Sequence, residues 1–123
     1  MNKTVVINIV GLSANLIGEH TPFIKRYIGN KHLQTIAPML SAVTTAVQST
    51  YITGKWPNEH GIVGNGWYDR TDCAIKFWKQ SNKLVLAEKI WERAKKTDPS
   101  FTTSKMFWWY NMYSGAEYAV TPR

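Results

Sequence analysis

The chain opens with a run of β-branched and aliphatic residues, 4–10, that only Asn8 interrupts before Gly11. A run that is apolar on both faces is typical of a buried strand in a parallel sheet. A second, shorter strand is predicted over residues 33–36, and a third over residues 101–108. These three segments predict the sheet of the protein.

Three other segments show the spacing of helices. Pro22 stands at a first helical position, apolar residues follow at helical spacing, and Gly29 with Asn30 ends the segment. A second helix is predicted over residues 44–52, where Gly54 ends it. A third apolar stripe runs over residues 84–94, with lysines after it, where the helix dipole favours cations.

The remaining segments carry fewer periodic signals. Residues 55–79 contain several glycines and predict a long, turn-rich loop, which we expect to be ordered because aromatic side chains can anchor it. The tail, residues 111–123, shows no further periodic element. The alternation of strands and helices predicts an α/β fold with a parallel sheet.

Composition narrows the class of protein and of partner. A chain of 123 residues with 44% hydrophobic residues can form one packed domain, which excludes wholesale disorder. The net charge of +7 favours an anionic partner, such as a phosphorylated small molecule, a nucleic acid or an acidic lipid surface. The apolar runs are too short for a membrane span or a signal peptide, so we expect a cytoplasmic protein. The single cysteine, Cys73, excludes an internal disulfide.

The start of the second predicted helix is the candidate site of chemistry. A hydroxyl at this position, on Thr44 or Thr45, would lie where unpaired backbone N–H groups and the positive end of the dipole can hold a phosphate. Threonine before a helix more commonly serves as a cap. The residues alone therefore leave both roles open.

A longer pattern around this helix resembles the nucleotide pyrophosphatase/phosphodiesterase family of the alkaline phosphatase superfamily. The pattern consists of a proline before the helix, a threonine, a Thr-Gly pair, and a Pro-x-x-His-Gly-Ile run followed by asparagine. In this chain they are Pro38, Thr44, Thr53-Gly54, Pro57, His60-Gly61-Ile62 and Asn65. The resemblance covers nearly the whole chain. It implies that residues 1–123 form the N-terminal part of a single alkaline phosphatase-like catalytic domain, a three-layer α/β sandwich with a mostly parallel sheet.

The resemblance also implies a mechanism. Thr44 is expected to be the nucleophile that forms a phospho-threonine intermediate, and Asn65 to contact the phosphate. Two divalent metal ions, generally zinc in this family, are expected to activate the hydroxyl, so Thr44 is also a metal contact. The expected activity is hydrolysis of phosphodiester, pyrophosphate or phosphate ester bonds in a nucleotide or another phosphorylated small molecule.

Two departures from the family pattern bear on activity. Val10 stands where the family has an aspartate that binds metal, and Val47-Gln48 replace an Asn-His pair. The family's other metal ligands would lie beyond residue 123. Because a zinc site needs three or four ligands, we expect the isolated chain to be inactive.

Two other classes of function remain open. One is a non-catalytic relative that binds a phosphorylated ligand or a partner. The other, which composition alone supports, is a basic nucleic-acid-binding module. His60 is expected to orient its loop, and the aromatic residues of the loop to pack against the fold in preference to stacking a base.

Overall fold

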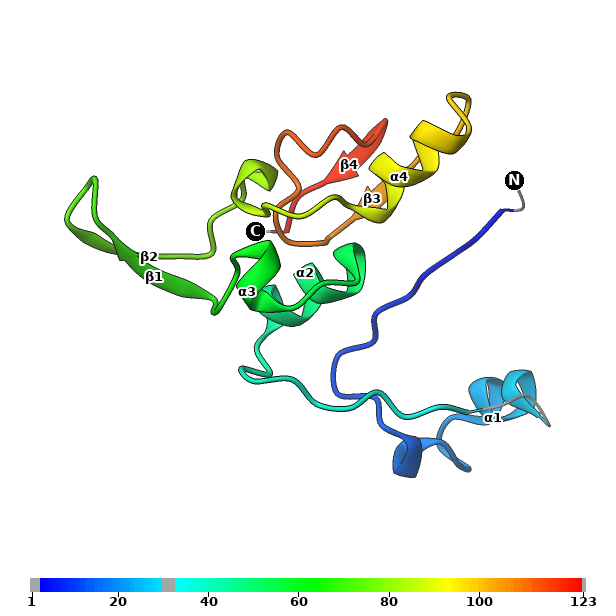
Figure 1. The fold of residues 1–123 in the computed structure, drawn as a ribbon. Coiled ribbons are helices and arrows are strands. Elements are labelled where there is room, and N and C mark those ends of the chain that lie inside the picture. Colours follow the sequence, from blue (N-terminus) through cyan, green and yellow to red (C-terminus); the bar gives the residue numbers. More distant parts are fainter. Residues whose placement is uncertain (1–2, 30–32, 123) are drawn as a thin grey trace. The chain divides into compact units, whose positions relative to one another are not determined.

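The computed structural model describes residues 3–29 and 33–122. By its backbone contacts the chain divides into two units, residues 2–38 and residues 39–123. Each unit is described by itself below, with the elements labelled as in Figure 1.

The N-terminal unit contains a short 3-10 helix, η1 (Ala14–Leu16), and the helix α1 (Pro22–Ile28). The prediction of a helix from Pro22 to Ile28 is confirmed. Pro22 occupies the first turn, where a missing N–H costs nothing, and Gly29 ends the helix with a φ of 49°. Asn30, the other predicted end signal, lies outside the described residues.

The strands predicted over residues 4–10 and 33–36 are wrong for this structure, because neither segment joins a sheet. Val5, Val6 and Ile7 are 81%, 72% and 74% exposed. A strand that is apolar on both faces needs neighbouring strands and two covering layers, and this unit has neither among its described residues. The β-branched pattern therefore indicates a preference for strand conformation, but the described residues of this unit supply no partner strand.

The C-terminal unit begins with α2 (Thr44–Thr53), which confirms the second predicted helix. Gly54 ends it in the left-handed conformation, with a φ of 64°, and donates its N–H to the Thr50 carbonyl at 2.8 Å. Val43 occupies the cap position and supplies no side-chain hydrogen bond. Thr44 is thus the first helical residue.

The predicted long loop, residues 55–79, contains more regular structure than its glycines suggested. It holds the short helix α3 (Pro57–His60) and an antiparallel hairpin of β1 (Gly66–Asp69) and β2 (Ala74–Phe77). The hairpin projects from the rest of this unit (Figure 1). Its register pairs Trp67 with Lys76.

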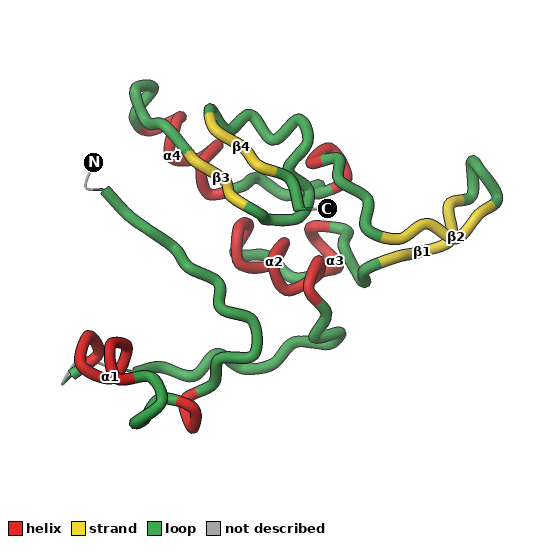
Figure 2. The backbone as a smooth tube through the Cα atoms, turned by 180° about the vertical axis from the view of Figure 1, so that it is seen from behind, coloured by secondary structure: helices red, strands yellow, loops and turns green. Residues whose placement is uncertain are grey.

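The last part of the chain, residues 82–120, differs from the prediction in one helix and two strands. Residues predicted to begin the third helix form a 3-10 turn, η2 (Asn82–Leu84), and α4 spans only Ile90–Thr97. The third predicted strand shortens to β3 (Ser104–Met106). It pairs in parallel with β4 (Tyr118–Val120), in the tail where no element was predicted (Figure 2).

The structure therefore combines helices with small sheets, in agreement with the α/β class. Its described strands form two separate two-stranded sheets, so the three-layer sandwich and the mostly parallel sheet are not seen. Among the described residues, no helix has the length and apolar character that crossing a membrane requires.

A small aromatic core holds the C-terminal unit together. Ile62, Val85 and Tyr110 are each no more than 2% exposed, and Trp67 and Trp109 pack against them. The Trp109 ring also stacks on Trp78, with centroids 4.7 Å apart. The expected packing role holds for Trp67, and Trp78 packs on Trp109 while remaining 44% exposed. It is wrong for Trp56, Tyr68 and Phe77, whose exposed fractions are 57%, 57% and 65%.

Candidate functional site

The first turn of α2 brings the two predicted site residues into the same neighbourhood. Thr44 is the first residue of the helix and is half-buried. Asn65 comes from the loop between α3 and β1. Its side-chain oxygen accepts a hydrogen bond from the backbone N–H of Thr45, at 3.1 Å. Asn65 therefore sits beside the residue that follows the predicted nucleophile, although twenty positions separate Thr45 from Asn65 in the sequence.

The contact with Thr45 also fixes which way the Asn65 amide faces. A backbone N–H can only donate, so the Asn65 atom that meets it must be the oxygen Oδ1. The amide nitrogen Nδ2 then occupies the other branch of the side chain. No described residue accepts a hydrogen bond from Nδ2, which leaves this donor available to a ligand.

Thr45 itself is buried and hydrogen-bonded. It has no exposed surface, and its hydroxyl oxygen lies 2.7 Å from the Gly64 carbonyl and 3.1 Å from Asn65 Oδ1. A buried hydroxyl held in this way is not accessible to a substrate. Of the two threonines at the start of α2, only Thr44 keeps exposed surface. The cap role is unsupported, because the cap residue is Val43.

His60 supports the loop that carries Asn65. Its ring is fully buried, and Nδ1 accepts a hydrogen bond from the Ile62 N–H at 3.1 Å. The proton must then be on Nε2, which lies 3.0 Å from the Thr50 hydroxyl of α2. Burial lowers the pKa of His60 and favours this neutral form. These contacts support the loop-orienting role expected for His60.

The buried face of α2 consists mainly of polar and small residues, which sequence reasoning missed as a packing surface. Thr45, Gln48 and Ser49 are each at most 7% exposed. Gln48 Oε1 accepts a hydrogen bond from the backbone N–H of Trp109 at 2.9 Å. Hydrophobic periodicity could not reveal this face, although the spacing of 45, 48, 49 and 52 matches one side of a helix.

The buried ammonium group of Lys105 contacts the same backbone segment as Gln48, around Trp109. Lys105 is 4% exposed, and its ammonium donates to the carbonyls of Trp109 at 3.1 Å and Tyr110 at 2.9 Å. It also lies 4.9 Å from the centroid of the Trp91 ring. Burial, and secondarily the charge of Lys89, lowers the pKa of Lys105 to about 8. Lys105 thus holds a turn of the backbone, a role that no sequence signal indicated.

The described residues do not fit a pair of divalent metal ions. Within 3–29 and 33–122, no three His, Cys, Asp or Glu side chains come together in a way that could hold an ion. Val10, at the position where the resemblance implies a metal-binding aspartate, is 82% exposed and has no ligating atom.

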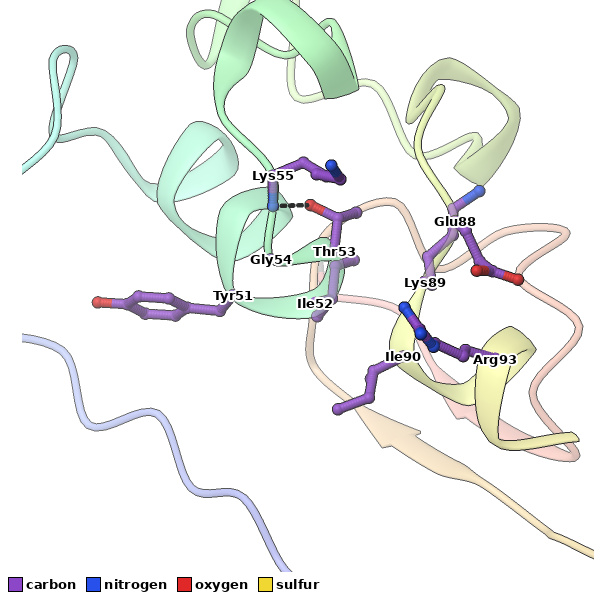
Figure 3. Close-up of a pocket in the computed structure, with 9 residues that line it drawn as sticks. All are labelled: Tyr51, Ile52, Thr53, Gly54, Lys55, Glu88, Lys89, Ile90 and Arg93. Carbon is purple, nitrogen blue, oxygen red and sulfur yellow. Dashed lines mark hydrogen bonds between the residues drawn. The ribbon is translucent and has the colours of Figure 1, made fainter. Parts of the chain in front are cut away.

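An open pocket of about 260 Å³ lies at the other end of α2 (Figure 3). Tyr51, Ile52 and Lys55 line it from one side, and Ile90 and Arg93 of α4 from the other. A helix of ten residues is about 15 Å long, so this pocket is distant from Thr44. The predicted site residues do not contribute to it.

Comparison with known proteins gives one finding. A family model described as Type I phosphodiesterase / nucleotide pyrophosphatase matches residues 4–123. The searches of curated proteins and of solved structures give no significant match.

Proposed function

Since the chain belongs to the type I phosphodiesterase/nucleotide pyrophosphatase family, we propose that it supplies the nucleophile and one phosphate contact of a hydrolase. The bonds cleaved are phosphodiester, pyrophosphate or phosphate ester bonds of nucleotide-type substrates. In this proposal residues 1–123 are the N-terminal part of one alkaline phosphatase-like catalytic domain.

The observation that carries the proposal is the position of Asn65 beside the first turn of α2. The start of a ten-residue helix favours a phosphate through its dipole and through N–H groups that have no partner within the helix, although the Thr45 N–H already donates to Asn65 Oδ1. Thr44 is the first residue of this helix, and Asn65 is hydrogen-bonded to the next residue, Thr45. This proximity supports the proposal that Thr44 is the nucleophile and that Asn65 donates to a phosphoryl oxygen.

The proposed reaction has two steps. The Thr44 oxygen attacks phosphorus, the bond to the leaving alcohol or nucleotide breaks, and the threonine proton passes through solvent to the leaving oxygen, which leaves a phospho-threonine. Water then attacks the same phosphorus, one of its protons passes to the threonine oxygen, and the threonine leaves as the hydroxyl while phosphate is released. In both steps Asn65 Nδ2 donates to a non-bridging phosphoryl oxygen as negative charge develops on it.

The family is generally metal-dependent, and we extend the proposal to two divalent ions, generally zinc in this family. Such ions would lower the pKa of the threonine hydroxyl. Thr44 Oγ1 is the one contact that the described residues offer them. The 123-residue chain by itself is therefore expected to lack hydrolase activity.

A second candidate is a non-catalytic relative that binds a phosphorylated ligand. Two points favour it: Val10 stands where the resemblance implies a metal-binding aspartate, and the described residues contain no group of three or more metal ligands. This candidate keeps the helix terminus and Asn65 as a binding site and omits the attack by Thr44.

The test is hydrolysis of p-nitrophenyl phosphate and of p-nitrophenyl thymidine monophosphate by the intact protein, which means residues 1–123 together with the rest of the proposed catalytic domain, with added zinc or manganese. Thr44→Ala is expected to abolish turnover and phosphoryl transfer to the protein. Asn65→Ala is expected to lower kcat by about 100- to 1,000-fold, the usual effect of losing one such donor. Thr102→Ala, at an exposed position, is the control.

Three results discriminate between the candidates. Turnover that depends on Thr44 supports the hydrolase. Binding of a nucleoside monophosphate that Thr44→Ala retains, in a protein without turnover, supports the binding module. Turnover of wild-type rate in Thr44→Ala refutes the assignment of the nucleophile.

A further inference from the structure

We propose that Thr45 is a positioning residue that holds the Asn65 side chain with its amide nitrogen toward the bound phosphoryl group. This inference rests on the proposed function, because it concerns the same site. It adds a residue that neither the motif nor the family match assigns to any role.

The need for such a residue follows from the shape of asparagine. The two branches of a carboxamide have nearly the same size, but one is a donor and the other an acceptor. Only the nitrogen can stabilise a phosphoryl oxygen, whereas the carbonyl oxygen would repel it. A site that uses Asn65 as a donor must therefore exclude the flipped orientation.

Thr45 distinguishes the two orientations through its backbone N–H, and its hydroxyl adds a second contact. The N–H can only donate, and it lies 3.1 Å from Asn65 Oδ1. The hydroxyl oxygen lies 3.1 Å from the same Oδ1 and 2.7 Å from the Gly64 carbonyl, and it can donate its proton to either oxygen. If the amide flipped, Nδ2 would face the N–H, and two donors would meet without an acceptor.

Burial makes this arrangement selective. Thr45 has no exposed surface, so water cannot replace the contact that a flipped Asn65 would lose. The hydroxyl also ties the loop to the helix through Gly64, the residue before Asn65. Thr45 therefore fixes both the place and the orientation of the amide.

The test uses Thr45→Val in the intact protein, because valine keeps the shape and the backbone N–H but removes the hydroxyl. The matched control is Thr53→Val, on the same helix, whose hydroxyl donates to the Ser49 carbonyl at 2.7 Å and makes no contact with Asn65 or His60. We expect Thr45→Val to lower kcat about three- to tenfold with little change in KM, as loss of one hydrogen bond implies. Thr45→Ser is expected to restore kcat, and Thr53→Val to leave it unchanged.

Two further measurements separate positioning from general stability. If Thr45 acts through Asn65, then Thr45→Val has no further effect on kcat in the Asn65→Ala background. Independent losses that multiply would overturn the proposal. The second measurement is the side-chain NH₂ signal of Asn65 in protein labelled with ¹⁵N-asparagine, assigned by its loss in Asn65→Ala. We expect Thr45→Val to shift or broaden this signal and Thr53→Val to leave it in place.

The NMR readout keeps the two proposals distinguishable. If the wild-type protein shows no hydrolysis, the proposed function fails, while the Asn65 signal still decides whether Thr45 holds the amide. If Thr45→Val leaves that signal unchanged, the positioning role is refuted, whatever the activity of the protein.

Discussion

Lys105 offers a sharp test of the packing, because its charge opposes folding at neutral pH. The side chain is 4% exposed, and burial lowers its pKa from an ordinary value of 10.5 to about 8, with a smaller contribution from the charge of Lys89. The perturbations are a rise in pH and the substitution Lys105→Met, which removes the titrating group but keeps a long apolar side chain.

The sign follows from the direction of the shift. The folded state binds this proton less tightly than the unfolded chain does, so protonation favours unfolding. The penalty is present in full below about pH 8 and is relieved as the pH rises toward 10.5. With these two pKa values, the free energy of unfolding rises by about 2 kcal/mol between about pH 7 and pH 9.5.

The assay is urea unfolding at several pH values, followed by tryptophan fluorescence. Other lysines and tyrosines titrate in the same range, so the informative quantity is the difference between wild type and Lys105→Met. We expect the wild type to gain about 2 kcal/mol on the variant across this interval. A difference that stays constant with pH would refute the argument that Lys105 is buried with a lowered pKa.

Three further predictions concern other buried contacts. Burial lowers the pKa of His60 below its ordinary value of 6.5, so the free energy of unfolding is expected to decrease as the pH falls below 6.5. In urea unfolding at several pH values, His60→Asn should show a smaller decrease over this range. Trp91→Phe removes the bond from the indole N–H to the Ser114 carbonyl, at 2.9 Å, and is expected to lower the free energy of unfolding by about 1–3 kcal/mol in urea; an unchanged midpoint would contradict this. In Gly66→Ala the new Cβ would lie 2.4 Å from the Phe77 ring and 2.9 Å from the Lys76 carbonyl oxygen, so amide exchange in the hairpin should accelerate; unchanged exchange would contradict this close approach.

The helices show where local signals suffice. The start of α1 at Pro22 and the end of α2 at Gly54 agree with the sequence, because proline restricts φ and glycine accepts the left-handed conformation. Hydrogen bonds within a helix join residues four apart, so the information lies in the same segment. The third helix was placed too early: an apolar stripe continues through η2 (Asn82–Leu84) without helical backbone between this turn and α4.

The strands show where local signals fail. Residues 4–10 have strong β propensity and remain exposed, whereas β4 (Tyr118–Val120) pairs with β3 although its segment showed no periodicity. A strand is stabilised by a partner that can lie anywhere in the chain. Propensity therefore indicates which segments could form strands and leaves open which of them pair.

The candidate site divides in the same way. The spacing of Thr44, Thr53-Gly54 and Asn65 was sufficient to recognise the family and to propose a nucleophile and a phosphate contact. The residue types and spacing of such a motif can be read from the sequence without knowledge of the packing. Three features became known only from the folded chain. They are the hydrogen bond from Thr45 to Asn65, the hydrogen bond from Trp109 to Gln48, and the burial of Lys105. Each of these contacts joins a polar group to a partner that the packing brings near, and no local preference of either residue specifies that partner.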